Sequence, residues 1–277
     1  MCIRDRLRTL PFNRLSMGIQ TFNESILKVL QRRHTARQAI EAFQNCRAAG
    51  FQNISIDLMY GLPGETLSTW QQDLDQALLL HPEHLSAYHL IYEEDTVLWK
   101  LREQHKVEEA DEDLSVSLFS TLIDRLTSEG YDHYEISNFS LPGLYSRHNS
   151  SYWTEKKYLG CGPSAHSYNG VSRQWNVASL DTYIKGISAG TPVFEIEELD
   201  LYTRYNDFVI TRIRTEWGMP LSKLRDEFGE KLYDYCLRMA APHLKQGTLE
   251  LVNDILKLTR KGIFISDGIM SDMLWTD

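Results

Sequence analysis

The chain has 277 residues, of which 42% are apolar, and this allows one large or two moderate domains with a packed core. Its 29 basic and 38 acidic side chains give a formal net charge of −9, which argues against a nucleic-acid partner. No apolar run approaches the roughly 18 residues of a membrane-spanning helix. Four dispersed cysteines favour reduced thiols, so the composition predicts a soluble cytoplasmic protein without a membrane segment.

The first strand is predicted by the alternation of apolar and polar residues over 14–20. Leu15, Met17 and Ile19 form its apolar face, and the opposite, polar face ends in Gln20. Asn23 is placed to cap a helix that follows.

A second strand ends abruptly in the run NISIDLMYGLPGET, residues 53–66. Its alternation puts Asp57 on the polar face, before glycines and a proline stop the strand and a helix opens at Thr66. In a barrel of parallel strands, polar groups near the carboxyl ends of the strands point at the ligand. Asp57 is therefore predicted to bind a ligand.

Further elements repeat at intervals of roughly 30 to 40 residues. Residues 35–50 read as an amphipathic helix, and a third strand lies in HLSAYHLIYEE, residues 84–94, although its inner face is ambiguous. Strands alternating with helices at this spacing predict β-α-β units and a parallel sheet.

The pattern changes in the second half of the chain. Residues 111–130 predict a long helix and residues 131–139 a strand, whereas 141–170 is rich in aromatic residues and glycine and reads as a binding loop. From about Leu199 the chain reads as two helices, a hairpin turning at Asn253 and Asp254, and a last helix. This order is typical of a winged-helix module.

Several motifs together resemble the radical S-adenosylmethionine barrel of the coproporphyrinogen III oxidase-like family. They are RLSMGIQTF, LQRRH, IDLMYGLPGET and HLSAYHLIYEE. Three others, YEISNFSLPG, RHNSSYW and YLGCGPSAHSY, resemble the haem-chaperone branch of that family. The resemblance runs from about Leu7 to the end of the chain.

The resemblance implies an α/β fold: the C-terminal half of a partial (β/α) barrel, followed by a mixed α+β accessory region with a winged-helix-like C-terminal module. The expected domains are residues 7–105 for the later half of the barrel, 106–195 for a linker helix and an aromatic, glycine-rich binding region, and 196–277 for the helical, winged-helix-like domain.

The family's cysteine loop, CxxxCxxC, which holds a 4Fe-4S cluster, has no counterpart here. Cys2, Cys46, Cys161 and Cys236 are scattered, and none has the close spacing with which one loop grips a cluster. The leading MCIRDR also has no counterpart in the family. We therefore expect an N-terminally truncated fragment whose longer parent carries the cluster, and we assign no catalytic or metal-binding residue.

Five positions match cofactor contacts of the family by resemblance: Gln20, Arg32, Asp57, Ile91 and His166. Arg32 is singled out by its place twelve residues after Gln20, and Ile91 can offer only packing. The alternatives are structural: Asp57 could pair with a barrel arginine, Gln20 could be a satisfied core amide, and Arg32 could lie on a solvated helix face. The His166 imidazole could instead serve a haem-related function.

The segment RHNSSYW provides candidate haem contacts, which are His148, Asn149, Tyr152 and Trp153. The imidazole of His148 can ligate iron, the two aromatic rings can flank a porphyrin, and Arg147 could pair with a propionate. Alternatively, His148 and Asn149 simply tie a loop to the barrel, and the aromatic residues pack at a domain interface.

Three functions stay open at this point. The resemblance favours a haem chaperone that binds haem and, in the full-length parent, a 4Fe-4S cluster and S-adenosylmethionine, and that delivers haem to an unknown acceptor, which could be membrane-associated. The second is an oxygen-independent coproporphyrinogen III oxidase, which decarboxylates propionates by radical chemistry. The third is an inactive fragment, so whether the chain is an enzyme stays open.

Overall fold

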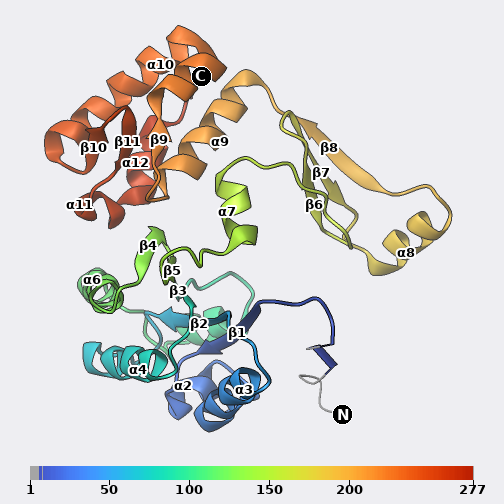
Figure 1. Cartoon of the computed structure of the whole chain (residues 1–277), viewed down its shortest axis with the longest axis vertical. Coiled ribbons are helices and arrows are strands. Elements are labelled where there is room, and N and C mark those ends of the chain that lie inside the picture. Colours follow the sequence, from blue (N-terminus) through green and yellow to red (C-terminus); the bar gives the residue numbers. More distant parts are fainter. Residues whose placement is uncertain (1–5, 8, 277) are drawn as a thin grey trace. The chain divides into compact units, whose positions relative to one another are not determined.

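The computed structural model describes residues 6–7 and 9–276. The chain splits into two compact units, Met1–Tyr145 and Ser146–Asp277 (Figure 1). Cys2 and most of the leading MCIRDR segment lie outside the described residues. The three domains expected from the sequence stay a prediction.

The first unit is built on a five-stranded sheet with the order β1-β2-β3-β5-β4. Its strands are β1 (Leu15–Gln20), β2 (Ile54–Tyr60), β3 (His84–His89), β4 (Asp132–Glu135) and β5 (Asn138–Ser140). The first three pair in parallel, which confirms the predicted β-α-β units.

The single strand expected over residues 131–139 is wrong in detail, because β4 and β5 form an antiparallel hairpin within it. The buried Glu135 carboxylate accepts the Ser137 N–H at 3.2 Å and the Asn138 side-chain amide at 2.5 Å. These bonds hold the chain in a turn between the two short strands.

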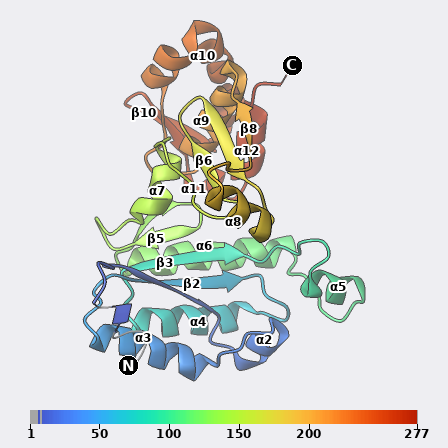
Figure 2. The ribbon, with the colours of Figure 1, turned by 90° about the vertical axis from the view of Figure 1, so that its right-hand side faces the viewer.

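The helices of this unit begin at side-chain caps. They are α2 (Glu24–Val29), α3 (Ala36–Ala48), α4 (Leu67–Leu79), α5 (Val97–Glu103) and α6 (Glu112–Ser128). Asn23 caps α2 as predicted, and Thr35 and Thr66 form capping boxes for α3 and α4. Figures 1 and 2 show α3 and α4 along one face of the sheet. The apolar side chains Ile54, Ile56 and Leu58 of β2 are fully buried.

The second unit contains two three-stranded sheets, β6-β7-β8 and β10-β11-β9. Its strands are β6 (His166–Tyr168), β7 (Ser172–Asn176), β8 (Phe194–Glu198), β9 (Met219–Pro220), β10 (Leu249–Val252) and β11 (Ile255–Leu258). Its helices are α7 (Arg147–Trp153), α8 (Leu180–Ser188), α9 (Leu201–Ile213), α10 (Leu221–Gln246), α11 (Arg260–Ile263) and α12 (Ser266–Met273).

Two sequence expectations for this unit can be compared with the structure directly. The hairpin of β10 and β11 is confirmed, with Asn253 and Asp254 at φ values of 50° and 71°, as a tight hairpin turn requires. The loop expected over 141–170 is wrong in part, because Ser146 caps the short helix α7 there. Within α10, Gly229 has non-helical angles of φ 79° and ψ 173° and divides the helix in two. The winged-helix assignment stays a prediction.

Candidate functional site

A polar face runs across the first unit's sheet. The strand register aligns Gly18 of β1 with Asp57 of β2, Ser86 of β3 and Asn138 of β5. Ser16 Oγ donates to Asp57 Oδ1 at 3.3 Å, and Ser86 Oγ donates to Asn138 Oδ1 at 3.0 Å. Asp57 stands near the carboxyl end of its strand, on a face with exposed neighbours, and its role as a ligand contact stays a prediction.

Gln20 and Arg32 both lie over Gly18. The Arg32 Nη2 donates to the Gly18 carbonyl at 3.2 Å. A methyl group added to Gly18 would come within 2.7 Å of Gln20 Nε2 and 3.6 Å of Arg32 Nη2. The structure therefore brings Gln20 and Arg32 together beside the strand partner of Asp57, and the space that they use exists because residue 18 has no side chain.

Arg32 reaches this position through local backbone geometry. Its N–H donates to the Leu27 carbonyl at 2.9 Å just beyond α2, and Gln31 has a φ of 53°. Gln20 itself has a φ of 72°, which bends the chain at the end of β1. Such left-handed geometry at a residue other than glycine is uncommon and often marks a functional site.

The other two predicted cofactor contacts lie apart from this group. Ile91 follows β3 and is 72% exposed. His166 belongs to β6 of the second unit, where its ring stacks on Trp175 with a centroid separation of 5.9 Å. These two residues stay candidates by resemblance.

Tyr88 is a polar-face residue that sequence reasoning missed. It follows Ser86 by two positions on β3 and is 43% exposed. Partial burial of the side chain raises the pKa of its phenol, a side-chain hydrogen bond with Ser86 lowers it, and the charges of Asp57 and Glu135 raise it. The alternation in β3 would have pointed to Tyr88 once the inner face was known, but both faces of that strand carry buried residues.

His84 is buried deeper in the same face. Its Nδ1 lies 2.8 Å from Ser55 Oγ and its Nε2 lies 2.7 Å from Tyr134 Oη. Burial and the nearby Arg14 lower the pKa of His84 to about 3. The imidazole is therefore neutral at physiological pH and connects three strands through two hydrogen bonds.

The turn after β2 is held by a buried carboxyl group. Glu65 Oε2 accepts the N–H of Gly61 at 2.6 Å and of Leu62 at 3.2 Å. Burial raises the pKa of Glu65 to about 7, against the lowering effect of these two hydrogen bonds. Glu65 thus stabilises the turn that ends β2, the strand that carries Asp57.

In the second unit, α7 separates the candidate haem contacts into two groups. The Nε2 of His148 lies 3.2 Å from Tyr152 Oη, and the two exposed side chains share one face of the helix. Trp153 instead packs under the Arg214 guanidinium, 4.4 Å from the ring centroid. Asn149 stands in the first turn, where its N–H donates to Ser146 Oγ at 3.4 Å. Only His148 and Tyr152 are brought together.

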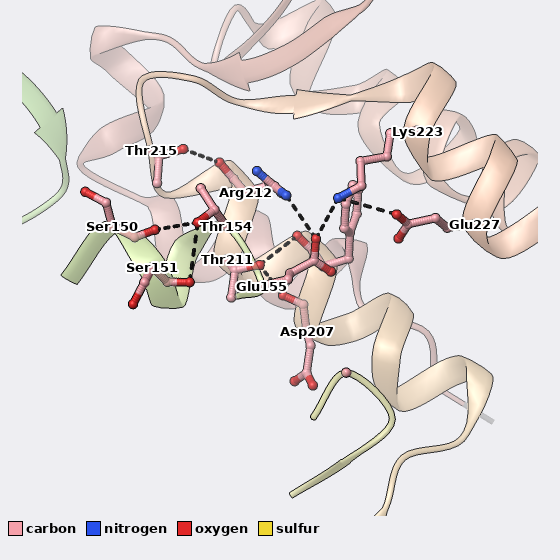
Figure 3. Close-up of polar contacts among 12 residues, drawn as sticks. Ser150, Ser151, Thr154, Glu155, Asp207, Thr211, Arg212, Thr215, Lys223 and Glu227 are labelled. Atoms are coloured by element: carbon pink, nitrogen blue, oxygen red, sulfur yellow. Dashed lines mark hydrogen bonds and ion pairs between the residues drawn. The ribbon is translucent and has the colours of Figure 1, made fainter. Parts of the chain in front are cut away.

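Glu155 anchors the end of α7 (Figure 3). Its Oε2 accepts from Arg212 Nη2 of α9 and from Lys223 Nζ of α10, both at 2.9 Å. Lys223 also pairs with Glu227 at 3.4 Å. One carboxylate therefore ties α7 to two helices.

A cavity of about 150 Å³ lies beside this anchor and is lined by Tyr152, Tyr158, Tyr168, Arg173 and Asp207, among others. It is smaller than the roughly 300 Å³ at which ligand pockets usually begin. This cavity is therefore too small to enclose a porphyrin.

Comparison with known proteins places the chain in a family. The Radical SAM superfamily model matches residues 4–77, and the HemN C-terminal domain model matches residues 199–265. The haem chaperone HemW of Lactococcus lactis is 31% identical over 96% of this chain and 70% of its own length, and that of Bacillus subtilis is 29% identical over 97% and 71%. The chain belongs to the haem chaperone HemW family.

The solved coproporphyrinogen III oxidase (HemN) of Escherichia coli has the same fold, with a TM-score of 0.80 over 98% of this chain and 66% of the oxidase chain. The sequence identity is 22%, so this likeness concerns the fold. Together with the Radical SAM match over residues 4–77, it confirms the predicted α/β architecture of the radical S-adenosylmethionine family.

Membership of the HemW family, with its Radical SAM domain, implies S-adenosylmethionine and a 4Fe-4S cluster as cofactors. The donor set of the polar face fits S-adenosylmethionine, because Arg32 offers a cationic donor fork for a carboxylate and Asp57 an acceptor for hydroxyl or amino groups. The glycine at position 18 leaves the room that the Gln20 and Arg32 side chains occupy.

The cysteines of the described residues do not fit a 4Fe-4S cluster. Cys236 is fully buried and its thiol pKa is raised to about 12 by burial, while Cys161 is exposed and Cys46 belongs to the other unit. Over residues 6–7 and 9–276, no group of three histidine, cysteine or acidic side chains is arranged to hold a metal ion.

Within the same residues, no helix has the length and apolar character to cross a membrane.

Proposed function

We propose that this chain acts as a haem chaperone: it binds haem and passes it to an acceptor protein in the cytoplasm. The observation that carries the proposal is the match to proteins named haem chaperone HemW over 96% and 97% of the chain. The net charge of −9 supports a protein acceptor over nucleic acid. A membrane-associated acceptor is compatible with this proposal.

The polar face of β1, β2 and β3 is the proposed S-adenosylmethionine site. Arg32 binds the carboxylate, Gln20 and Asp57 hydrogen-bond polar groups of the ligand, and Ile91 and His166 contribute by resemblance to the family. The support is the placement of Gln20 and Arg32 over Gly18, the strand partner of Asp57. When bound to a reduced cluster, S-adenosylmethionine supplies a 5′-deoxyadenosyl radical in related enzymes. The residues named here bind and orient it.

The proposed haem ligand is His148. Its exposed imidazole lies on α7 with Tyr152 beside it, so a haem iron could approach from solvent while the tyrosine ring borders the porphyrin edge. Trp153 and Asn149 would act indirectly, Trp153 by packing against Arg214 and Asn149 within the capped first turn.

A spectral titration of the chain with haem tests this assignment. His148→Asn should weaken haem binding at least tenfold and shift the Soret band, because an iron–imidazole bond is lost. His105→Asn is the matched control, since His105 is also exposed and lies in the other unit. If both variants bind haem as tightly as the unsubstituted chain does, the ligand is not His148, and His166 or Cys161 becomes the next candidate.

A separate assay addresses the oxidase alternative. The full-length parent, supplied with coproporphyrinogen III, S-adenosylmethionine and a reductant, should release no CO2. Stoichiometric decarboxylation would refute the chaperone proposal in favour of the oxidase.

A further inference from the structure

The second unit has an arm, residues 164–198, made of β6, β7, α8 and β8 (Figure 1). Large apolar side chains are exposed along it: Leu180, Ile184 and Ile187 on one face of α8, followed by Val193, Phe194 and Ile196. All five residues of β8 are exposed. Because proteins usually bury apolar side chains of this density, the arm has the character of a binding surface.

The backbone of β8 is open on its outer edge. Leu199 N–H donates to Val171 O at 2.9 Å and Val177 N–H donates to Val193 O at 3.1 Å, so odd-numbered residues face β7. The N–H and C=O groups of Phe194, Ile196 and Glu198 consequently point away from the sheet. No hydrogen bond from them is found among residues 6–7 and 9–276. A further strand could pair there.

The side chains of β8 define what such a strand must carry. Glu195 and Glu197 share one face, and Phe194 and Ile196 share the other. None of the strand's three glutamates has an ion pair within the described part of the chain. Arg173, the cross-strand neighbour of Glu197, is paired with Asp207 instead.

These charges disfavour a second copy of the chain as the occupant. Antiparallel pairing of β8 with itself about Ile196 would put Glu195 directly opposite Glu197, twice. Like charges directly opposite in a sheet are destabilising, whereas opposite charges are stabilising. The strand therefore favours a basic partner over self-pairing in this register.

We propose that the β8 edge is a docking site for an extended protein segment that alternates basic and apolar residues and adds a fourth strand to the β6-β7-β8 sheet. The basic side chains lie opposite Glu195 and Glu197, and the apolar ones cover Phe194 and Ile196. Backbone hydrogen bonds give the affinity and the two alternating faces give the specificity. This surface contains no residue of the proposed haem site on α7.

Fluorescence anisotropy with a labelled, end-capped (Lys-Val)3 peptide tests the site on the complete chain, with (Glu-Val)3 as the control peptide. The lysine peptide should bind, more weakly at high salt, and the glutamate peptide should not. E195K/E197K should weaken lysine-peptide binding about tenfold and favour the glutamate peptide instead. E93K/E94K, the same charge change in the other unit, should leave binding unchanged.

A backbone variant separates pairing from simple charge attraction. Ile196→Pro removes an outward N–H without touching the β7 ladder, because residue 196 does not hydrogen-bond to β7. It should abolish peptide binding while circular dichroism stays unchanged. Equal binding of both peptides, full binding by Ile196→Pro, or a β8-dependent dimer in analytical ultracentrifugation would each overturn the proposal.

Discussion

Gly61 and Gly64 form a matched pair in the turn after β2. Their φ values are 72° and 73°, so alanine at either position enters the left-handed region, at a cost of about 1 to 2 kcal/mol. A methyl group on Gly64 would meet nothing within 4 Å, whereas on Gly61 it would lie 2.6 Å from His89 Nε2 and 2.9 Å from Cε1. The two substitutions therefore differ only in the steric clash.

The His89 ring cannot easily move away. Its Nδ1 lies 2.8 Å from the Leu90 carbonyl, its Nε2 lies 3.0 Å from Ser115 Oγ, and its plane meets Tyr60 edge-on at 5.2 Å. Displacing it adds about 1 to 3 kcal/mol. Gly61→Ala should thus lower the free energy of unfolding by about 2 to 5 kcal/mol, and Gly64→Ala by about 1 to 2 kcal/mol.

Urea unfolding followed by circular dichroism measures both values by linear extrapolation. Equal losses for the two variants would refute the packing argument, because the backbone strain is shared. A Gly61→Ala chain that does not fold, beside a Gly64→Ala chain that does, would agree with it.

Two further predictions concern buried groups and cysteines. The pKa of Glu65 is raised from 4.5 to about 7, so its ionisation disfavours the folded state, and this group's stability contribution is full below pH 4.5 and lost as pH rises through 7. Relative to the unsubstituted chain, Glu65→Gln should therefore gain about 2.5 kcal/mol of unfolding free energy between pH 5 and pH 8 in urea unfolding, and an unchanged difference would count against the burial argument. Anaerobic reconstitution with iron and sulfide should give no stoichiometric 4Fe-4S absorption or paramagnetic signal, and a stoichiometric cluster would contradict the reading of the cysteines.

The strands of the first unit could be predicted because local pattern and tertiary role agree. In β2 the alternation of Ile54, Ile56 and Leu58 matches the buried face, and the glycines after it mark the end of the strand. The position of Arg32 could not be derived from periodicity, because it depends on left-handed geometry at Gln20 and Gln31. Family resemblance supplied that assignment.

The elements around residues 141–198 were harder to predict for a different reason. The α7 segment RHNSSYW consists largely of residues with modest helix propensity, and its helix depends on the Ser146 cap and on the Glu155 anchor to α9 and α10. The separation of Trp153 from Tyr152 follows from helical geometry, which could not be foreseen while the segment was read as a loop.

The bend inside α10 depends on residue 229 being glycine, which has no β-carbon. Its backbone angles, φ 79° and ψ 173°, fall in a region that is essentially reserved for glycine. A methyl group there would meet no atom within 4 Å, so the restriction is conformational and not steric crowding by neighbours. Any other residue at position 229 would favour one continuous helix over two shorter helices. Residue 229 therefore sets the direction in which the chain leaves the bend. It also sets which side of the following helical segment faces inward, so this orientation depends on one position and not on the whole helix.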